Sequence, residues 1–121
     1  MGYLQALFLS TTIQLSLPPG LLSSICYIES KHKIQTIRHN DGGSDSIGIC
    51  QIKLKTAQWL GFKGTAQELL EPKNNIYYAG KYLALNLKKY HTATKAVIAY
   101  NQGHVNASQT NTNYQSKVFE Q

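Results

Sequence analysis

The apolar stretch that ends in Glu29 restricts the possible folds most, because it places a carboxyl group inside a helical pattern of apolar residues. A helix here would bring Glu29 out at the edge of its buried stripe. Partial desolvation at that edge raises the pKa of a carboxyl group and makes a proton available near neutral pH. The plainer alternative is a Glu side chain that rims the helix and stays solvated. Two adjacent rows carry the helical spacing: Leu21, Ile25 and Ile28, and Leu22, Cys26 and Glu29.

Length and charge limit the class of protein. A chain of 121 residues is long enough for one domain with one core, and we expect residues 1–121 to form it. The net charge of +6 favours an anionic partner, such as nucleic acid, a membrane surface or an acidic cell-wall polymer. The basic residues are dispersed, however, and Arg38 is the single arginine, so we expect no nucleic-acid partner.

The N-terminal segment, the cysteines and the histidines give weaker signals. Residues 1–17 lack a basic n-region and a clear cleavage site, so we expect no signal peptide. No stretch is long enough to span a bilayer, and we expect no stable membrane insertion. Cys26 and Cys50 allow one disulfide or two free thiols, and neither the cysteines nor the histidines have metal-ligand spacing. We therefore assign no metal and no cofactor.

Turn and capping signals divide the chain into helices around one polar loop. Asn, Asp, Gly and Ser cluster over residues 35–48, and Asp41-Gly42 is a hairpin-turn dipeptide, so we expect a loop or a small irregular hairpin there. Pro72 would open the longest helix, and Gly80 would let another helix approach it closely. The predicted architecture is mainly α. The expected helical segments are residues 3–15, about 18–31, 56–60, 72–90 and 93–100, with a capping box at 65–68, a loop over 105–113 and a last turn over 114–119.

Short motifs stand in a fixed order along the chain. They are Glu29-Ser30, residues 48–52 (Gly-Ile-Cys-Gln-Ile), residues 69–83, residues 99–103 (Ala-Tyr-Asn-Gln-Gly) and residues 114–118 (Tyr-Gln-Ser-Lys-Val). Their order and spacing resemble the soluble-type lytic transglycosylase (SLT) domain, an α+β lysozyme-like fold that acts on peptidoglycan. The resemblance covers about residues 16–119. It departs from the family at Cys50, where Met or Phe is usual, and in a lengthened loop that resembles members found with secretion and conjugation machinery and in phages.

The resemblance implies one catalytic residue, Glu29. As a general acid it would protonate the glycosidic oxygen of a MurNAc–GlcNAc β-1,4 bond. It would then act as base on the sugar's C6 hydroxyl, which closes onto C1 and gives a 1,6-anhydro sugar. Ordinary glycosidases need two carboxylates for the same work.

The resemblance also implies substrate-binding and supporting residues. Gln51 and Tyr100 would contact substrate, with the Tyr100 hydroxyl near Glu29, and Ser44 or Ser46 could contact it from the loop. The alternatives are a Gln51 amide that caps nearby backbone and a Tyr100 ring that belongs to the core. Ser30, Gly48 and Asn101 would support the site, Asn101 by bracing the Glu29 helix or loop backbone. Cys26 and Cys50 are expected near each other beside the cleft.

Other functions remain open at this point. A muramidase of similar fold would use Asp45 or Asp41 as a second carboxylate, and Asp45 is the stronger rival because Asp41 already has a role in a turn dipeptide. A non-catalytic glycan-binding or virion structural domain is a further alternative, and the net charge keeps a nucleic-acid binder as the last. In the leading interpretation the partner is peptidoglycan, with a secretion or virion assembly as a further partner, and the protein acts at the bacterial cell wall.

Overall fold

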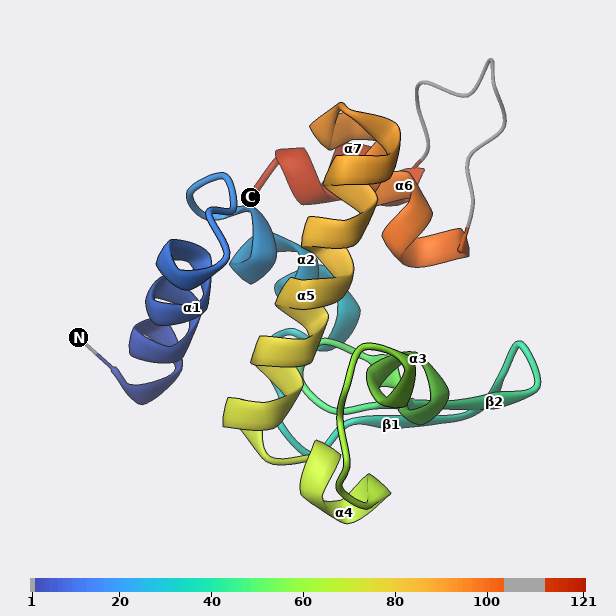
Figure 1. The fold of residues 1–121 in the computed structure, drawn as a ribbon. Coiled ribbons are helices and arrows are strands. Elements are labelled where there is room, and N and C mark those ends of the chain that lie inside the picture. Colours follow the sequence, from blue (N-terminus) through green and yellow to red (C-terminus); the bar gives the residue numbers. More distant parts are fainter. Residues whose placement is uncertain (1, 104–112) are drawn as a thin grey trace.

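The helix α5 (Pro72–Tyr90) lies at the centre of the molecule, and other elements pack around it (Figure 1). The computed structural model describes residues 2–103 and 113–121. Pro72 occupies the first turn of α5, where a missing N–H costs no hydrogen bond. Ile76, Gly80 and Leu83 are buried along one face. The predicted bounds of this helix, residues 72–90, are confirmed.

Helix α1 (Tyr3–Gln14) packs against α5 through the glycine that the sequence singled out. A Cβ atom on Gly80 would lie 2.6 Å from Cγ2 of Thr11, closer than van der Waals contact allows. Phe8 of α1 is buried in the same core. The prediction that Gly80 permits close helix approach is therefore confirmed.

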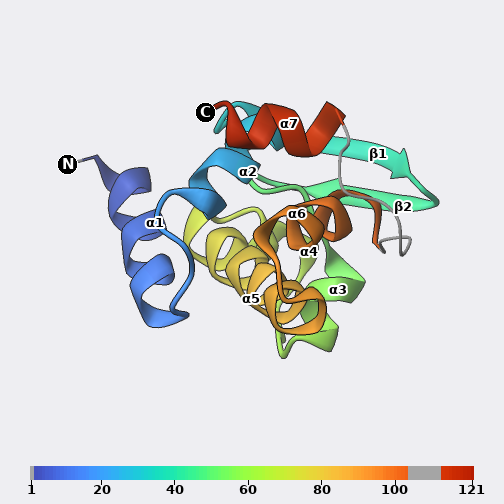
Figure 2. The same ribbon diagram turned by 90° about the horizontal axis from the view of Figure 1, so that it is seen from above.

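Helix α2 (Leu21–Ser30) carries Glu29 in its last turn. It begins after Gly20 and not at the prolines, so the predicted start at about residue 18 was wrong. The reason is the left-handed backbone of Gly20, whose φ of 77° turns the chain into the helix. Helix α7 (Asn113–Phe119) packs along α2, and its Val118 is buried in the core (Figure 2).

A three-stranded antiparallel sheet projects on the side of α5 opposite to α1 (Figure 1). Its strands are β1 (Ile37–Asp41), β2 (Ser44–Ile47) and β3 (Ile52–Lys53). Asp41 pairs with Ser44, so the turn consists of Gly42 and Gly43, one residue beyond the predicted dipeptide. The register shifts between Arg38 and Asp41, which is the geometry of a β-bulge. The predicted small irregular hairpin is confirmed.

Three short helices complete the fold: α3 (Leu54–Trp59), α4 (Ala66–Leu69) and α6 (Ala93–Gln102). The predicted capping box closes the start of α4, where Glu68 N–H donates to Thr65 Oγ1 at 3.1 Å and Thr65 N–H donates to Glu68 Oε1 at 2.8 Å. Helix α3 begins two residues before the predicted start, and α6 continues two residues past Tyr100. Most of the loop predicted over 105–113 lies outside the described residues.

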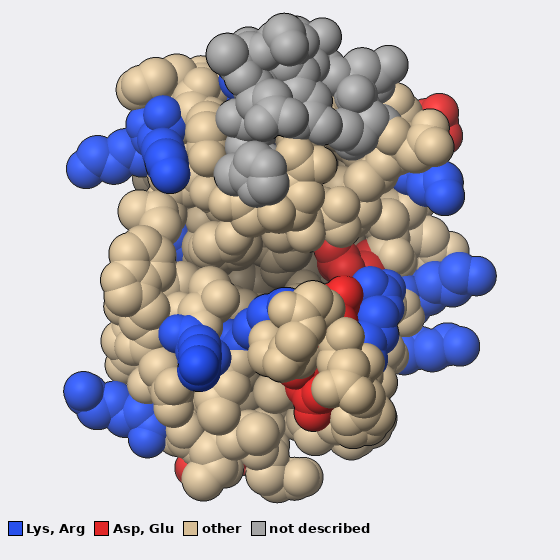
Figure 3. All heavy atoms as spheres, turned by 90° about the vertical axis from the view of Figure 1, so that its right-hand side faces the viewer, with Lys and Arg blue, Asp and Glu red and all other residues tan. Residues whose placement is uncertain are grey.

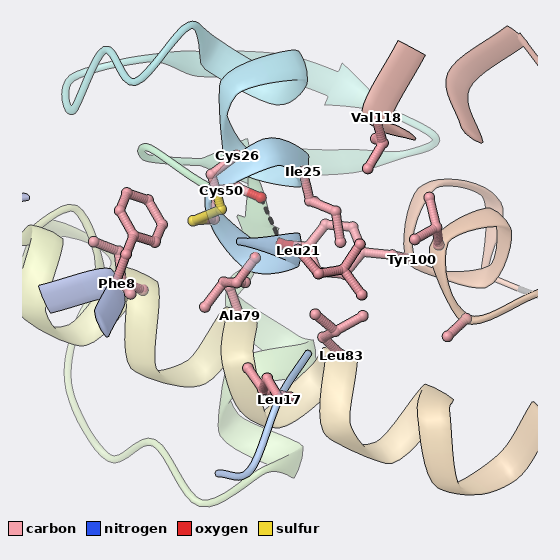
Figure 4. Packing of buried hydrophobic residues seen from close by; sticks show 14 of the residues in the cluster. Phe8, Leu17, Leu21, Ile25, Cys26, Cys50, Ala79, Leu83, Tyr100 and Val118 are labelled. Carbon is pink, nitrogen blue, oxygen red and sulfur yellow. Dashed lines mark hydrogen bonds between the residues drawn. A yellow bond between two sulfur atoms is a disulfide. The ribbon is translucent and has the colours of Figure 1, made fainter. Parts of the chain in front are cut away.

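The main core lies between α1, α2, α5, α6 and α7 (Figure 4). A smaller cluster under the sheet joins Ile47 and Ile52 to side chains of α3 and α4. The mainly helical architecture with a small sheet is thus the one that the sequence predicts. Among the described residues, none of the helices combines the length and the apolar character needed to cross a membrane.

Candidate functional site

A cleft of about 480 Å³ opens beside the sheet, on the face shown in Figure 3. That face is hollowed, and acidic and basic side chains adjoin at the rim of the hollow. Of the predicted site residues, Glu29, Ser46, Gln51, Tyr100 and Asn101 line the cleft, whereas Ser30, Ser44 and Gly48 do not. The other lining residues come from the sheet, from α3, from α5 and from the end of α6: Arg38, Asp41, Gly42, Ile52, Lys53, Thr56, Tyr82, Gln102 and Gly103.

Glu29 reaches the cleft with only 7% of its surface exposed. The hydroxyl of Tyr114 donates a hydrogen bond to its Oε2 at 2.6 Å. Arg38 Nη1 lies 3.4 Å from Oε1, and the second guanidinium nitrogen donates to the backbone carbonyl of Glu29. Two side chains from distant parts of the chain therefore hold the carboxylate in one orientation.

Burial raises the pKa of Glu29 above its usual value, and desolvation is the largest cause. The hydrogen bond from Tyr114 and the positive charge of Arg38 act in the opposite direction, while the negative charge of Asp41 adds to the rise. The pKa of Tyr114 is itself raised by burial and by the charge of Glu29, so this hydroxyl keeps its proton and remains a donor. A carboxyl group in this setting can hold a proton closer to neutral pH than an exposed one.

Tyr114 and Arg38 are residues of the site that the sequence did not predict. Tyr114 opens the closing motif of the family resemblance, which is a usable signal for a role in the site. Arg38 stands out as the single arginine, but in the sequence this count served only as an argument against recognition of nucleic-acid bases. Nothing in the local sequence indicates that a bulged strand turns its side chain toward Glu29.

A disulfide joins α2 to the segment that carries Gln51. Cys26 and Cys50 are bonded, with Cα atoms 4.3 Å apart, and both are fully buried (Figure 4). The prediction that the two lie close together is confirmed, and the open choice between a bond and free thiols is settled as a bond. Ser30 supports the same junction, because its Oγ donates to the carbonyl of Ile49 at 2.6 Å.

The backbone around Gln51 is fixed by glycine and by a buried asparagine. Gly48 has a φ of 81°, and a Cβ atom there would lie 2.3 Å from Nδ2 of Asn75. Asn75 accepts from the N–H of Cys50 at 2.9 Å and donates to the carbonyls of Ile47 and Leu69. The backbone of Gly48 thus packs directly against Asn75, a buried residue that the sequence did not single out. The supporting role of Gly48 in the site stays a prediction.

The side chain of Gln51 bears on the two interpretations that the sequence left open. Its Nε2 donates to the carbonyls of Thr36 and Gly48 at 3.0 and 2.9 Å, so the amide does cap nearby backbone. Its Oε1 is buried and has no hydrogen-bond partner among the described residues. The oxygen is therefore an unsatisfied acceptor in a residue of the cleft wall.

Tyr100 and Asn101 both line the cleft, but the hydroxyl of Tyr100 bonds to backbone and not to Glu29. The Tyr100 hydroxyl donates to the carbonyl of Cys50 at 2.7 Å, so it is not the group that orients Glu29 (Figure 4). Burial raises the pKa of Tyr100 well above its usual value. Helix α6 places the Tyr100 ring against Tyr82. Asn101 is exposed on the cleft wall, and its bracing of the Glu29 helix or loop backbone stays a prediction.

The two loop acids have different surroundings. Asp41 lines the cleft and accepts a hydrogen bond from the buried Ser46 at 2.6 Å. Asp45 contacts His39 at 3.2 Å and accepts from the N–H of Asn40, on the part of the hairpin outside the cleft. The structure therefore favours Asp41 as the candidate second carboxylate of a muramidase, whereas the sequence favoured Asp45. Within the ranges 2–103 and 113–121, His, Cys, Asp and Glu form no group of three that could hold a metal.

Comparison with known proteins is consistent with this geometry. The chain is 31% identical over 106 residues to an X polypeptide of Escherichia coli, a match that covers 84% of this chain and 63% of the relative. It is 33% identical over 87 residues to X polypeptide of strain K12 (70% and 52%) and 32% identical over 90 residues to Protein IpgF of Shigella flexneri (73% and 59%). The chain thus spans between half and two thirds of the length of these relatives. The family model of the transglycosylase SLT domain matches residues 7–121, and the protein therefore belongs to that family.

Proposed function

We propose that the protein is a lytic transglycosylase that cleaves the MurNAc–GlcNAc β-1,4 bond of peptidoglycan and forms 1,6-anhydro-MurNAc. The observation that carries the proposal is the buried Glu29 carboxyl group, which has a raised pKa and faces a cleft in a domain of the SLT family. An acid in this state can hold the proton that a glycosidic leaving group needs.

The reaction balances with one carboxyl group. Glu29 gives its proton to the glycosidic oxygen as the bond between that oxygen and C1 of MurNAc breaks. The carboxylate then takes the proton of the C6 hydroxyl, whose oxygen closes onto C1. Glu29 ends in its starting state, and no water is consumed. The N-acetyl group of the substrate would take the second role that a carboxylate fills in ordinary glycosidases.

Other cleft residues would bind the sugar. Gln51 lines the cleft wall, and its side chain could contact the glycan there. Ser46 and the ring of Tyr100 line the cleft wall and could contact it, and the exposed amide of Asn101 offers a further polar contact. Ser44 does not line the cleft, so we favour Ser46 as the loop serine that meets substrate.

A hydrolase of the muramidase type is the second candidate, and one observation favours it. Asp41 lines the same cleft, and its negative charge contributes to the raised pKa of Glu29. Asp41 could hold a water on the far side of the sugar, as the second carboxylate of an inverting enzyme does. Against this, Asp41 accepts from Ser46 and its backbone carbonyl accepts from Lys53, so its contacts also explain it as a structural residue of the hairpin.

Product mass separates the two candidates. Purified peptidoglycan is digested, and the fragments are separated and weighed. Fragments one water lighter than hydrolytic products support the transglycosylase. Reducing MurNAc ends, with an inactive Asp41→Asn and an active Asp45→Asn control, would establish the hydrolase. A gel with embedded cell wall, run first, would reveal a non-catalytic glycan-binding domain by the absence of a cleared band.

The cellular setting follows from the same proposal. A peptidoglycan substrate places the activity at the bacterial cell wall, and the positive net charge suits a wall that carries carboxylates and anionic polymers. Association with a secretion or virion assembly stays a prediction.

A further inference from the structure

The sheet presents a row of three polar residues to the cleft, one from each strand. Arg38 of β1 pairs with Ser46 of β2, and Ser46 pairs with Lys53 of β3. Directly opposed residues in antiparallel strands point to the same face of the sheet, and all three line the cleft. The two outer strands lie about 10 Å apart, since each strand spacing is about 4.8 Å. Two cationic groups thus flank one small hydroxyl residue.

The charges of the described cleft residues balance only while Glu29 is ionised. Arg38 and Lys53 are the basic residues among them, and Glu29 and Asp41 are the acidic ones. A guanidinium group keeps its charge at any pH of interest. When Glu29 takes up the proton that the proposed reaction requires, the cleft carries two positive charges and one negative charge. One further anionic group would restore the balance.

The contact between Arg38 Nη1 and the carboxyl group of Glu29 can be exchanged at low cost. Its N···O distance of 3.4 Å is longer than the 2.7–2.9 Å of a strong charge-assisted bond. The Arg38 side chain is 48% exposed, whereas that of Glu29 is 6% exposed. Arg38 Nη1 can therefore turn from the carboxyl group toward a ligand, while the second guanidinium nitrogen keeps its bond to the backbone carbonyl of Glu29. The hydrogen bond from Tyr114 would continue to orient the carboxyl group.

We propose that Arg38 and Lys53 form a subsite for a carboxylate carried by the stem peptide of the glycan substrate, and that occupation of this subsite draws Arg38 Nη1 away from the carboxyl group of Glu29. The inference rests on the proposed function and adds the class of substrate that the cleft selects, a glycan with free carboxylates. Arg38 acts here as a specificity-determining and positioning residue. Lys53 fixes the far side of the subsite, and its ammonium group already contacts the backbone carbonyl of Asp41.

The proposal predicts that carboxylate binding and proton uptake by Glu29 are coupled. Among the described residues, four groups face Glu29 from the elements packed around it: Tyr114 of α7, Tyr100 of α6, and Arg38 and Asp41 of β1. Turning Arg38 Nη1 toward a ligand weakens the effect of the one positive charge in this set. The proton affinity of Glu29 rises as a result, and by linkage a protonated Glu29 favours the anionic ligand.

The test uses a disaccharide muropeptide, GlcNAc–MurNAc with a stem peptide, in two forms. One form has free carboxylates and the other is fully methyl-esterified. Neither contains a MurNAc–GlcNAc bond, so the wild-type protein cannot consume them by the proposed reaction. Calorimetry in two buffers of different ionisation enthalpy measures both the affinity and the protons taken up. We expect the acid to bind about fivefold more tightly than the ester, as suits a half-exposed charge pair, and only the acid to drive proton uptake.

Three variants assign the effect to the subsite. Arg38→Gln should lose both the preference for the acid and the proton uptake, and Arg38→Lys should restore part of the preference. Lys88→Gln, an exposed position of α5 outside the cleft, removes the same charge and should keep both. Thermal melting checks that each variant is folded.

The outcomes of this binding test distinguish failure of the subsite from failure of the proposed transglycosylase activity. Equal binding of acid and ester, a preference that survives Arg38→Gln, or binding of neither form overturns the subsite. An acid preference that Arg38→Gln removes supports it, whether or not the wild-type protein digests peptidoglycan. Digestion with no acid preference overturns the subsite alone, and an acid preference without digestion overturns the proposed activity alone.

Discussion

The hydroxyl of Tyr114 donates a 2.6 Å hydrogen bond to Oε2 of Glu29, across 85 positions of the chain. Glu29 lies in the last turn of α2, and Tyr114 lies in α7, which packs along it. The bond and the burial of Glu29 act in opposite directions on its titration. The bond favours the ionised carboxylate, while desolvation favours the protonated one. The balance between these two effects sets the acidity of the candidate catalytic group.

Replacement of Tyr114 by Phe should raise the pKa of Glu29 further. The ring still fills its place, but the donor that stabilises the carboxylate is lost. The alkaline limb of the rate profile, along which the general acid deprotonates, should move to higher pH. The rate at the optimum should fall by roughly tenfold, because the carboxyl group is less well oriented.

A pH profile of peptidoglycan digestion measures both effects of Tyr114→Phe. The matched control is Tyr77→Phe, on α5 and outside the cleft, which should leave the profile unchanged. An alkaline limb that stays in place or moves to lower pH in Tyr114→Phe would contradict the assigned direction.

Glu29→Gln should give a folded protein with essentially no peptidoglycan-digesting activity, since an amide fills the same space but has no acidic proton. It should also change how stability depends on pH. The folded-state pKa of Glu29 is raised, so between the usual pKa of a glutamate and this raised pKa the native wild type binds more protons than the unfolded chain. The stability contributed by this group is fully present below the usual pKa and is lost as pH rises through the folded pKa.

Melting temperatures of the two proteins at acid and neutral pH test this sign. The wild type should lose stability relative to Glu29→Gln as pH rises. Digestion by the variant at more than a few per cent of the wild-type rate would count against the catalytic role. A wild type that gains relative stability with pH would show that burial does not dominate the titration of Glu29.

Tyr100→Phe should act mainly on stability. The hydroxyl of Tyr100 donates to the buried carbonyl of Cys50, so its removal leaves that carbonyl without this bond. We expect a loss of about 1–3 kcal/mol in the free energy of unfolding, the usual cost of an unsatisfied buried group. Urea denaturation measures it, with Tyr77→Phe again as the control. A tenfold loss of rate at unchanged stability would instead support a direct role of the Tyr100 hydroxyl at Glu29.

The double variant Cys26→Ala with Cys50→Ala should be less stable by about 3 kcal/mol or more. The bond closes a loop of 24 positions, and a cross-link of that length removes about this much free energy from the unfolded chain. Because both cysteines are fully buried, a thiol reductant should act on the native protein only as fast as it opens. Urea denaturation of the variant and of the oxidised wild type gives the difference, and a difference within about 0.5 kcal/mol would contradict the prediction.

Local signals in the sequence were enough for most of the helices. Pro72 and the apolar spacing after it predicted both ends of α5, because a first-turn proline and a stripe at 3.6 residues are properties of one segment. The capping box at Thr65 was readable for the same reason. The start of α2 was misplaced, since Gly20 competes with the prolines as a start signal and only its left-handed backbone decides between them.

The candidate site was only partly accessible from the sequence. The position of Glu29 in an apolar helix, together with the order of the motifs, was enough to single it out as the candidate acid. The order of the motifs could not show which tyrosine hydroxyl reaches it. Tyr100 and Tyr114 both stand in motifs, yet the first bonds to the backbone of Cys50 and the second to Glu29.

The sequence by itself thus determined most of the helices and the hairpin, because spacing, capping and turn chemistry act over a few residues. The order of its motifs, through the family resemblance, singled out the candidate acid. Tertiary structure alone decided what surrounds that acid. Packing of α7 on α2 brings in Tyr114, and a bulge in β1 accompanies the turn of Arg38 toward the cleft. The close approach of α2 to the segment before Gln51 allows the disulfide. Each of these contacts joins segments that no local pattern relates, and it depends on how whole elements bury their apolar faces together.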